Sequence, residues 1–223
     1  MPRTLALPGP RDRPASLDEP PGSDATGDVE AARQGDPDDA ERQDLMACVV
    51  ACPPHPQFGG RRSDPRLRAV SDALTDRGVA CLRFDYGPWD EGRGEQTDVR
   101  TALAWTRERY AAVGLFGYSF GAGVALCGAA DAEDPPSAVS VLAPPAEIGG
   151  GEVPACLDRL AVSVQVVVGE RDTTVDSAPV ADLARTGGDL VETFPGDHHF
   201  LGQTERIGAR VAEFLLPHLQ EGP

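Results

Sequence analysis

A serine lies between two glycines in the segment Gly117-Tyr118-Ser119-Phe120-Gly121. An apolar run at 111–117 precedes it and a small-residue run to about 130 follows, so the serine falls at a strand-to-helix turn, the context in which this pattern indicates a nucleophile. The two glycines leave room for neighbouring backbone, and Ser119 can therefore adopt a strained conformation that exposes Oγ. We predict Ser119 as a nucleophile; the alternative is a glycine-rich turn with an incidental serine.

A serine hydroxyl needs a base, and the chain has four histidines. His198 and His199 follow an apolar run at 189–194 and a Pro-Gly turn, which predicts a position at the carboxyl edge of a parallel sheet, where functional groups gather. The base is therefore expected from this pair. His55 lies in an early loop, and His218 is expected to be a solvated residue of the last helix.

An acidic partner for the imidazole is expected between the serine and the histidine in chain order. Asp172 meets this condition and follows the most apolar run, at 162–169. Its carboxylate would hold the imidazole tautomer and stabilise the imidazolium. Taken alone, an aspartate at this place is more often a turn or cap residue, and Asp176 is assigned to such a cap.

The segment CPPHPQFGG (52–60) follows the first core strand and is expected to help bind an oxyanion. Acyl transfer needs N–H donors from the residue after the nucleophile, here Phe120, and from an early loop. Proline has no N–H, which leaves His55 or, as the alternative, Gln57. His55 could equally be a loop residue that serves only local packing.

Apolar strand-like runs alternate with helical patterns from about residue 45 onward, which predicts an α/β fold with a mostly parallel sheet of about six core strands and helices on both faces. The expected strands cover 45–52, 79–86, 111–117, 137–143, 162–169 and 189–194, and the expected helices cover 66–78, 97–110, 119–130, 177–186 and 203–219.

Residues 1–44 are rich in Pro, Gly, Asp and Glu and contain few large apolar residues. Such a segment cannot offset its ordering entropy by burial, so a largely disordered acidic tail is predicted, with a possible short edge strand near 4–8. The folded domain is expected at 45–220.

Five motifs follow one another along the chain: HPQFGG, RFDY with GRGE after it, GYSFGAGVAL, LAPPAE and PGDHHF. With these motifs, residues 45–216 resemble the small lidless α/β-hydrolases, which are relatives of the dienelactone hydrolases. The resemblance implies an α/β-hydrolase fold and carboxylic ester hydrolysis. In such proteins a glycine, two residues, the catalytic histidine and an aromatic residue follow one another. Gly196, His199 and Phe200 fit that spacing, so His199 is the first choice for the base and His198 the second.

The sequence departs from the family pattern at two places. Pro53 stands where the early loop commonly has a first histidine, and Ser119 stands where dienelactone hydrolases have a cysteine, which argues against the dienelactone reaction. Only a short loop separates LAPPAE from the run at 162–169, so no large cap domain is expected and the site should be open. Phe58 and Tyr118 are predicted to contact substrate.

The composition limits the partners. A formal net charge of −16 argues against nucleic acid or anionic membranes as partners. All basic residues are arginines apart from the histidines, and the acidic excess suggests salt adaptation (a halophilic protein). No apolar run reaches the roughly 18 residues of a membrane span, and the N-terminus does not resemble a signal peptide, so a cytoplasmic protein is expected.

The five cysteines show neither metal-ligand spacing nor a secreted pattern and are expected to be small buried residues without a disulfide framework. No cofactor and no metal are predicted, and the oligomeric state stays open.

Together these features predict a serine hydrolase for a small ester or thioester. The alternatives are an acyltransferase or peptidase on the same scaffold, or a non-catalytic binding protein that keeps the fold.

Overall fold

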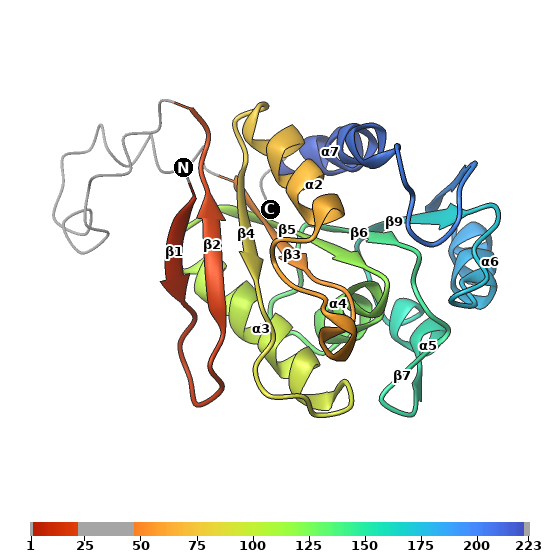
Figure 1. Ribbon diagram of the computed structural model, residues 1–223, viewed down its shortest axis with the longest axis horizontal. Coiled ribbons are helices and arrows are strands. Elements are labelled where there is room, and N and C mark those ends of the chain that lie inside the picture. The colour runs from red at the N-terminus through yellow and green to blue at the C-terminus, as the bar shows by residue number, and fades with distance from the viewer. Residues whose placement is uncertain (1, 22–46, 221–223) are drawn as a thin grey trace, which may run out of the picture.

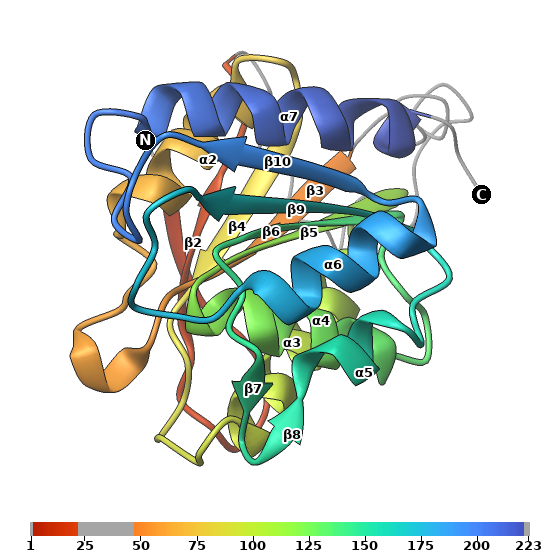
Figure 2. The same cartoon turned by 90° about the vertical axis from the view of Figure 1, so that its right-hand side faces the viewer.

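The computed structural model describes residues 2–21 and 47–220, which fold around one eight-stranded sheet of order β1-β2-β4-β3-β5-β6-β9-β10 (Figures 1 and 2). Six neighbouring strands are parallel, and β1 and β2 add an antiparallel edge. The strands are β1 (Arg3–Ala6), β2 (Pro14–Asp18), β3 (Ala47–Cys52), β4 (Ala80–Phe84), β5 (Ala112–Tyr118), β6 (Ala138–Leu142), β9 (Ser163–Gly169) and β10 (Leu190–Phe194).

Helices cover both faces of the sheet (Figure 2). On one face lie α2 (Pro65–Thr75) and α7 (Thr204–Gln220), which pack against each other; on the other lie α3 (Arg93–Arg107), α4 (Phe120–Ala130), α5 (Val153–Leu157) and α6 (Ala178–Gly187). Residues 143–162 contain only α5 and a hairpin of β7 (Glu147–Ile148) and β8 (Gly151–Glu152). The predicted α/β class, with six parallel core strands and no large cap domain, is confirmed.

The central strands are buried along their whole length, because a helix layer covers each side of the sheet. This holds for β3, β4, β5 and β6. The helix α4 is also buried nearly all round, since it lies between the sheet and the helices α3 and α5. Its small residues allow this close packing, and its first turn is therefore held rigidly at the carboxyl end of β5.

The described N-terminal residues are more ordered than the predicted disordered tail, and they include an edge strand, β1, close to the one named as possible near 4–8. Residues 2–21 include β1 and β2, and β2 pairs antiparallel with β4, so the folded part of the chain begins before residue 45. Leu17 is buried, and Arg11 and Arg13 both bind the buried carboxylate of Asp98 in α3 at 2.8 and 3.1 Å. The low apolar content was misleading because ion pairs to a buried acid hold this segment. Residues 22–46 lie outside the described residues.

The cysteine prediction also needs a correction. Cys48, Cys52 and Cys81 are buried free thiols, as expected, but Cys127 and Cys156 form a disulfide between α4 and α5. The two residues are 29 positions apart in the chain, and the packing of α4 on α5 brings their Cα atoms to 4.9 Å. Spacing along the sequence carries no sign of that proximity.

Of the described helices, none has the length and apolar character needed to cross a membrane.

Candidate active site

Ser119 occupies a sharp turn between β5 and α4 and has a positive φ of 58°, a strained conformation for a residue other than glycine. A Cβ atom at Gly117 would lie 2.3 Å from the Gly121 carbonyl oxygen, and one at Gly121 would lie 2.3 Å from that of Pro53. Both glycines are therefore required by close backbone approach, as the sequence pattern predicted. The Ser119 N–H donates to the Leu142 carbonyl at 2.8 Å, which fixes the turn to the end of β6.

A hydrogen-bonded series links Ser119, His198 and Asp172. Ser119 Oγ lies 2.8 Å from His198 Nε2, and His198 Nδ1 lies 2.7 Å from Asp172 Oδ2. Asp172 Oδ1 accepts from the N–H groups of Thr174 and Val175 at 2.8 and 3.2 Å, so the carboxylate is held from both sides. With Nδ1–H donating to the carboxylate, Nε2 is free to accept the serine proton, which is the geometry of a nucleophile, base and acid.

His199, the first choice for the base, does not reach the serine. It is exposed, and its backbone N–H donates to Asp197 Oδ1 at 3.0 Å. The turn at 197–200 is closed by a hydrogen bond from the Phe200 N–H to the Asp197 carbonyl, and the Phe200 ring is fully buried in the core. Since exposure alternates along this turn, burial of Phe200 leaves His199 in solvent and turns His198 inward. The geometry therefore corrects the order of the two candidates: His198, the second choice, contacts Ser119, and His199 does not.

Tyr118 lies behind the series rather than in contact with a substrate. Its side chain is 2% exposed, and its hydroxyl donates to the His198 carbonyl oxygen at 2.9 Å. The Arg66 guanidinium lies 4.6 Å from the ring centroid. Burial raises the pKa of Tyr118 to about 12. The prediction of Tyr118 as a substrate contact is therefore corrected, because its ring is covered by the loop that carries His198.

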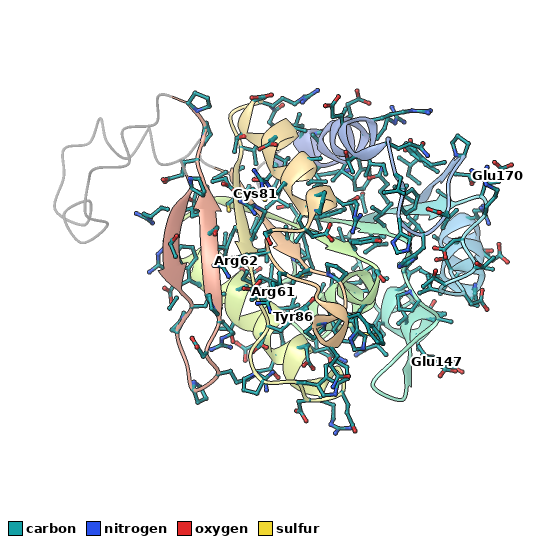
Figure 3. All side chains as sticks on the ribbon, viewed as in Figure 1. Arg61, Arg62, Cys81, Tyr86, Glu147 and Glu170 are labelled. Carbon is teal, nitrogen blue, oxygen red and sulfur yellow. A yellow bond between two sulfur atoms is a disulfide. The ribbon has the colours of Figure 1, made fainter. Side chains whose placement is uncertain are left out.

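A cavity of about 610 Å³ opens beside Ser119. Four neighbouring rings contribute to its lining: His55 lies 4.6–4.7 Å (centroid to centroid) from Phe58, Trp89 and Phe120. Phe58, predicted to contact substrate, is 86% exposed in this wall. The other lining residues are Glu91, Pro145, Glu147, Ile148, Gly149, Gly150, Thr174 and Val175. Glu147 is exposed and extends outward from β7 (Figure 3).

Two backbone donors beside Ser119 are available to bind an anion. Within the described part of the chain, the N–H groups of Phe120 and His55 have no hydrogen-bond acceptor, whereas the Gln57 N–H donates to His55 Nδ1 at 3.3 Å. This favours the predicted pair, Phe120 and His55, over the alternative Gln57. Burial among the rings lowers the pKa of His55, and the charge of Glu95 partly opposes that shift.

The loop that carries Trp89 is held by the buried carboxylate of Glu95, which was not predicted from the sequence. Glu95 is fully buried and accepts from the N–H groups of Asp90 and Gly92 at 2.9 and 2.8 Å, so α3 begins at Arg93 rather than near Thr97. A glutamate at the third position of a helix is a known capping signal and could have revealed this start. The N-terminal hairpin reaches the same loop, since Arg11 donates to the Pro88 carbonyl at 2.6 Å.

A tyrosine beneath the early loop was also missed. Tyr86, labelled in Figure 3, follows β4. It is buried, and its hydroxyl donates to the Pro53 carbonyl oxygen at 3.1 Å. Its ring packs edge-on against Phe120. No sequence pattern identifies such a contact, because the hydroxyl and the carbonyl are 33 residues apart.

Among the residues that the structure describes, no group of three or more His, Cys, Asp or Glu side chains is arranged to hold a metal ion.

The chain matches no protein-family model and no curated protein. Solved structures do resemble it. A lidless α/β serine hydrolase from Xanthomonas campestris has a TM-score of 0.75 and 24% identity over 100% of this chain and 97% of its own. Est1E from Butyrivibrio proteoclasticus has a TM-score of 0.75 and 17% identity over 96% of this chain and 98% of its own.

A dienelactone hydrolase from Anabaena variabilis is similar over 98% of this chain and 99% of its own, with a TM-score of 0.67 and 19% identity. At these identities the likeness concerns the fold. The resemblance inferred from the motifs is confirmed at that level: the chain has the α/β-hydrolase fold of the lidless serine hydrolases and of proteins like the dienelactone hydrolases.

Proposed function

We propose that this protein is a serine hydrolase that cleaves small carboxylic esters or thioesters through an acyl-enzyme intermediate. The observation that carries the proposal is the hydrogen-bonded series Asp172–His198–Ser119, with separations of 2.7 and 2.8 Å, at the edge of an apolar cavity. The likeness of the fold to esterases and serine hydrolases supports the same class of reaction.

In the proposed first half-reaction His198 Nε2 removes the Ser119 proton while Oγ bonds to the carbonyl carbon. The oxyanion that forms accepts hydrogen bonds from the N–H groups of Phe120 and His55. When the intermediate collapses, the bond to the alcohol or thiol breaks, and the leaving group takes the proton from His198. Asp172 stabilises the transient imidazolium throughout.

In the second half-reaction water replaces the alcohol. His198 removes a proton from the water molecule, whose oxygen bonds to the acyl carbon, and the carboxylic acid leaves as Oγ takes the proton back. The free enzyme is regenerated with no net change in protonation. An acyltransferase would differ only in the acceptor, so the product formed in the presence of an added alcohol separates the two reactions. We expect free acid as the main product.

The cavity favours an uncharged acyl group of modest size. Its described lining combines four aromatic rings with apolar groups and two carboxylates, Glu91 and Glu147, and contains no arginine. A negatively charged acyl group would therefore meet like charges there and no arginine to pair with. Est1E, one of the proteins of similar fold, has been solved with ferulic acid bound. Esters of aromatic as well as short aliphatic acids are therefore the first substrates to test.

Ser119→Ala tests the proposal directly. We expect the rate of hydrolysis of 4-nitrophenyl butyrate to fall by at least about 10³-fold, because the residual rate without a nucleophile comes only from binding and the oxyanion donors. Circular dichroism should show an unchanged fold. Ser63→Ala, which removes an exposed hydroxyl outside the cavity, serves as the control and should keep the full rate. Wild-type activity in Ser119→Ala would refute the assignment.

A further inference from the structure

The loop that carries His198 is held at two consecutive carbonyl groups. The His198 carbonyl accepts from the Tyr118 hydroxyl at 2.9 Å, and the His199 carbonyl accepts from Arg66 Nη1 at 3.3 Å. The two donors come from the end of β5 and the start of α2. A backbone segment that is anchored at neighbouring peptide groups has little freedom to tilt, so these contacts restrict the orientation of the imidazole.

The two donors also support each other. The Arg66 guanidinium lies over the Tyr118 ring at 4.6 Å and pairs with Asp64 at 2.6 Å, and the Arg66 side chain is only 14% exposed. Because its pKa is raised to about 12, the Tyr118 hydroxyl stays protonated and remains a donor over the pH range of ester hydrolysis. Tyr118 directly precedes Ser119, so its contact ties the base to the strand that carries the nucleophile.

Tyr86 makes the matching contact on the other side of Ser119. Its buried hydroxyl donates to the Pro53 carbonyl at 3.1 Å, at the beginning of the loop that carries His55. Burial raises the pKa of Tyr86 well above its ordinary value, so this hydroxyl is also a permanent donor. The same carbonyl is the one that a side chain at Gly121 would strike, which shows how closely this loop approaches the turn of the nucleophile.

We propose that Tyr118 and Tyr86 are positioning residues for two different groups of the site: Tyr118 sets the orientation of the base, His198, and Tyr86 sets the position of the oxyanion donor at His55. This inference rests on the proposed function, in which His198 moves the proton and the His55 N–H binds the oxyanion. It assigns to each tyrosine an effect that a merely structural hydroxyl would not produce.

Tyr118→Phe removes the hydroxyl and keeps the ring beneath Arg66. We expect kcat for 4-nitrophenyl butyrate to fall about tenfold while KM stays within twofold, because the cavity lining is untouched. A looser imidazole holds its hydrogen bond to Asp172 less well, so we expect this bond to weaken in the variant.

Tyr86→Phe should lower kcat by a similar or smaller factor and leave the hydrogen bond between His198 and Asp172 intact, because the base is not disturbed. Tyr110→Phe is the matched control: Tyr110 is buried, and its hydroxyl has no hydrogen-bond partner among the described residues. Its kcat and KM should equal those of the wild type. A wild-type kcat in Tyr118→Phe or in Tyr86→Phe would overturn the assignment.

Proton NMR provides a readout that does not depend on turnover. The proton between His198 Nδ1 and Asp172 should resonate at low field in the wild type, broaden or disappear in Tyr118→Phe, and persist in Tyr86→Phe. If Ser119→Ala had full activity, the proposed function would fail, and this resonance would still decide whether Tyr118 orients His198. An unchanged resonance in Tyr118→Phe would disprove that role.

Discussion

Two loops bring a histidine to the edge of the sheet beside Ser119, and they use it differently. In the loop at 195–200 the His198 ring is buried and both ring nitrogens have partners, Ser119 and Asp172. In the loop at 53–60 the His55 ring packs against aromatic side chains, and its Nδ1 only accepts from the Gln57 N–H. The ring nitrogens of His198 thus make the hydrogen bonds in the loop at 195–200, whereas in the loop at 53–60 the backbone N–H of His55 is the group without an acceptor among the described residues.

The difference follows from how each loop is built. The loop at 53–60 has prolines at 53, 54 and 56, which fix the backbone and remove their own N–H groups, so one of the few remaining donors is held in place. The loop at 195–200 is set by the burial of Phe200, which turns His198 inward. The comparison teaches that surroundings, and not residue type, decide whether a histidine at this edge can act as a base.

The largest expected effect separates the two adjacent histidines. His198→Ala should lower kcat/KM for 4-nitrophenyl butyrate by about 10³-fold or more, because the proposed proton acceptor for Ser119 is lost. His199→Ala should stay within about threefold of the wild type, since its exposed ring contacts neither Ser119 nor Asp172. Steady-state kinetics measure both, and the reverse ranking would restore His199 as the base.

The next effect tests whether His55 acts through its backbone. Its φ of −57° is already compatible with proline, so His55→Pro removes the N–H with little change of backbone conformation. We expect kcat to fall about 10²-fold, as for the loss of one oxyanion donor. His55→Ala keeps the N–H and should lose less than tenfold. Equal losses in the two variants would show that the ring, and not the N–H, carries the function of His55.

The smallest effect concerns the His55 ring and stability. Because burial lowers the pKa of His55 from its ordinary value of 6.5, the unfolded chain binds the proton more readily than the folded protein below that pH. As the pH falls from 6.5 toward the lower pKa of the folded protein, protonation of the unfolded chain therefore lowers the free energy of unfolding. Well above pH 6.5 the shift has no effect on stability. Between pH 7.5 and pH 5 the wild type should lose slightly more free energy of unfolding than His55→Ala, measured by urea denaturation. A larger loss in His55→Ala would contradict the direction of this shift.

Features that depend on neighbours along the chain could be predicted from the sequence. Apolar runs and turn residues indicated the strands, because strand burial and turn conformation depend on a few consecutive side chains. The elbow at Ser119 was predicted for the same reason: the glycines that it needs lie two positions on either side. Chain order after successive strands also selected Asp172, since the carboxyl ends of parallel strands meet at one edge.

Features that depend on distant contacts could not be predicted in this way. His198 and His199 are adjacent in one loop, and only His198 faces Ser119. Which of the two does so depends on the packing of Phe200 in the core. The N-terminal hairpin joins the sheet because Arg11 and Arg13 meet Asp98, more than 80 residues away.

The sequence alone thus determined the fold class, the sharp turn at Ser119 and the set of candidate groups, since these follow from local pattern and strand order. The tertiary structure decided which histidine faces the serine, which tyrosines support the two loops and which cysteines join. Each of these depends on a contact between segments far apart in the chain, and such a contact exists only once the sheet and its helix layers have formed.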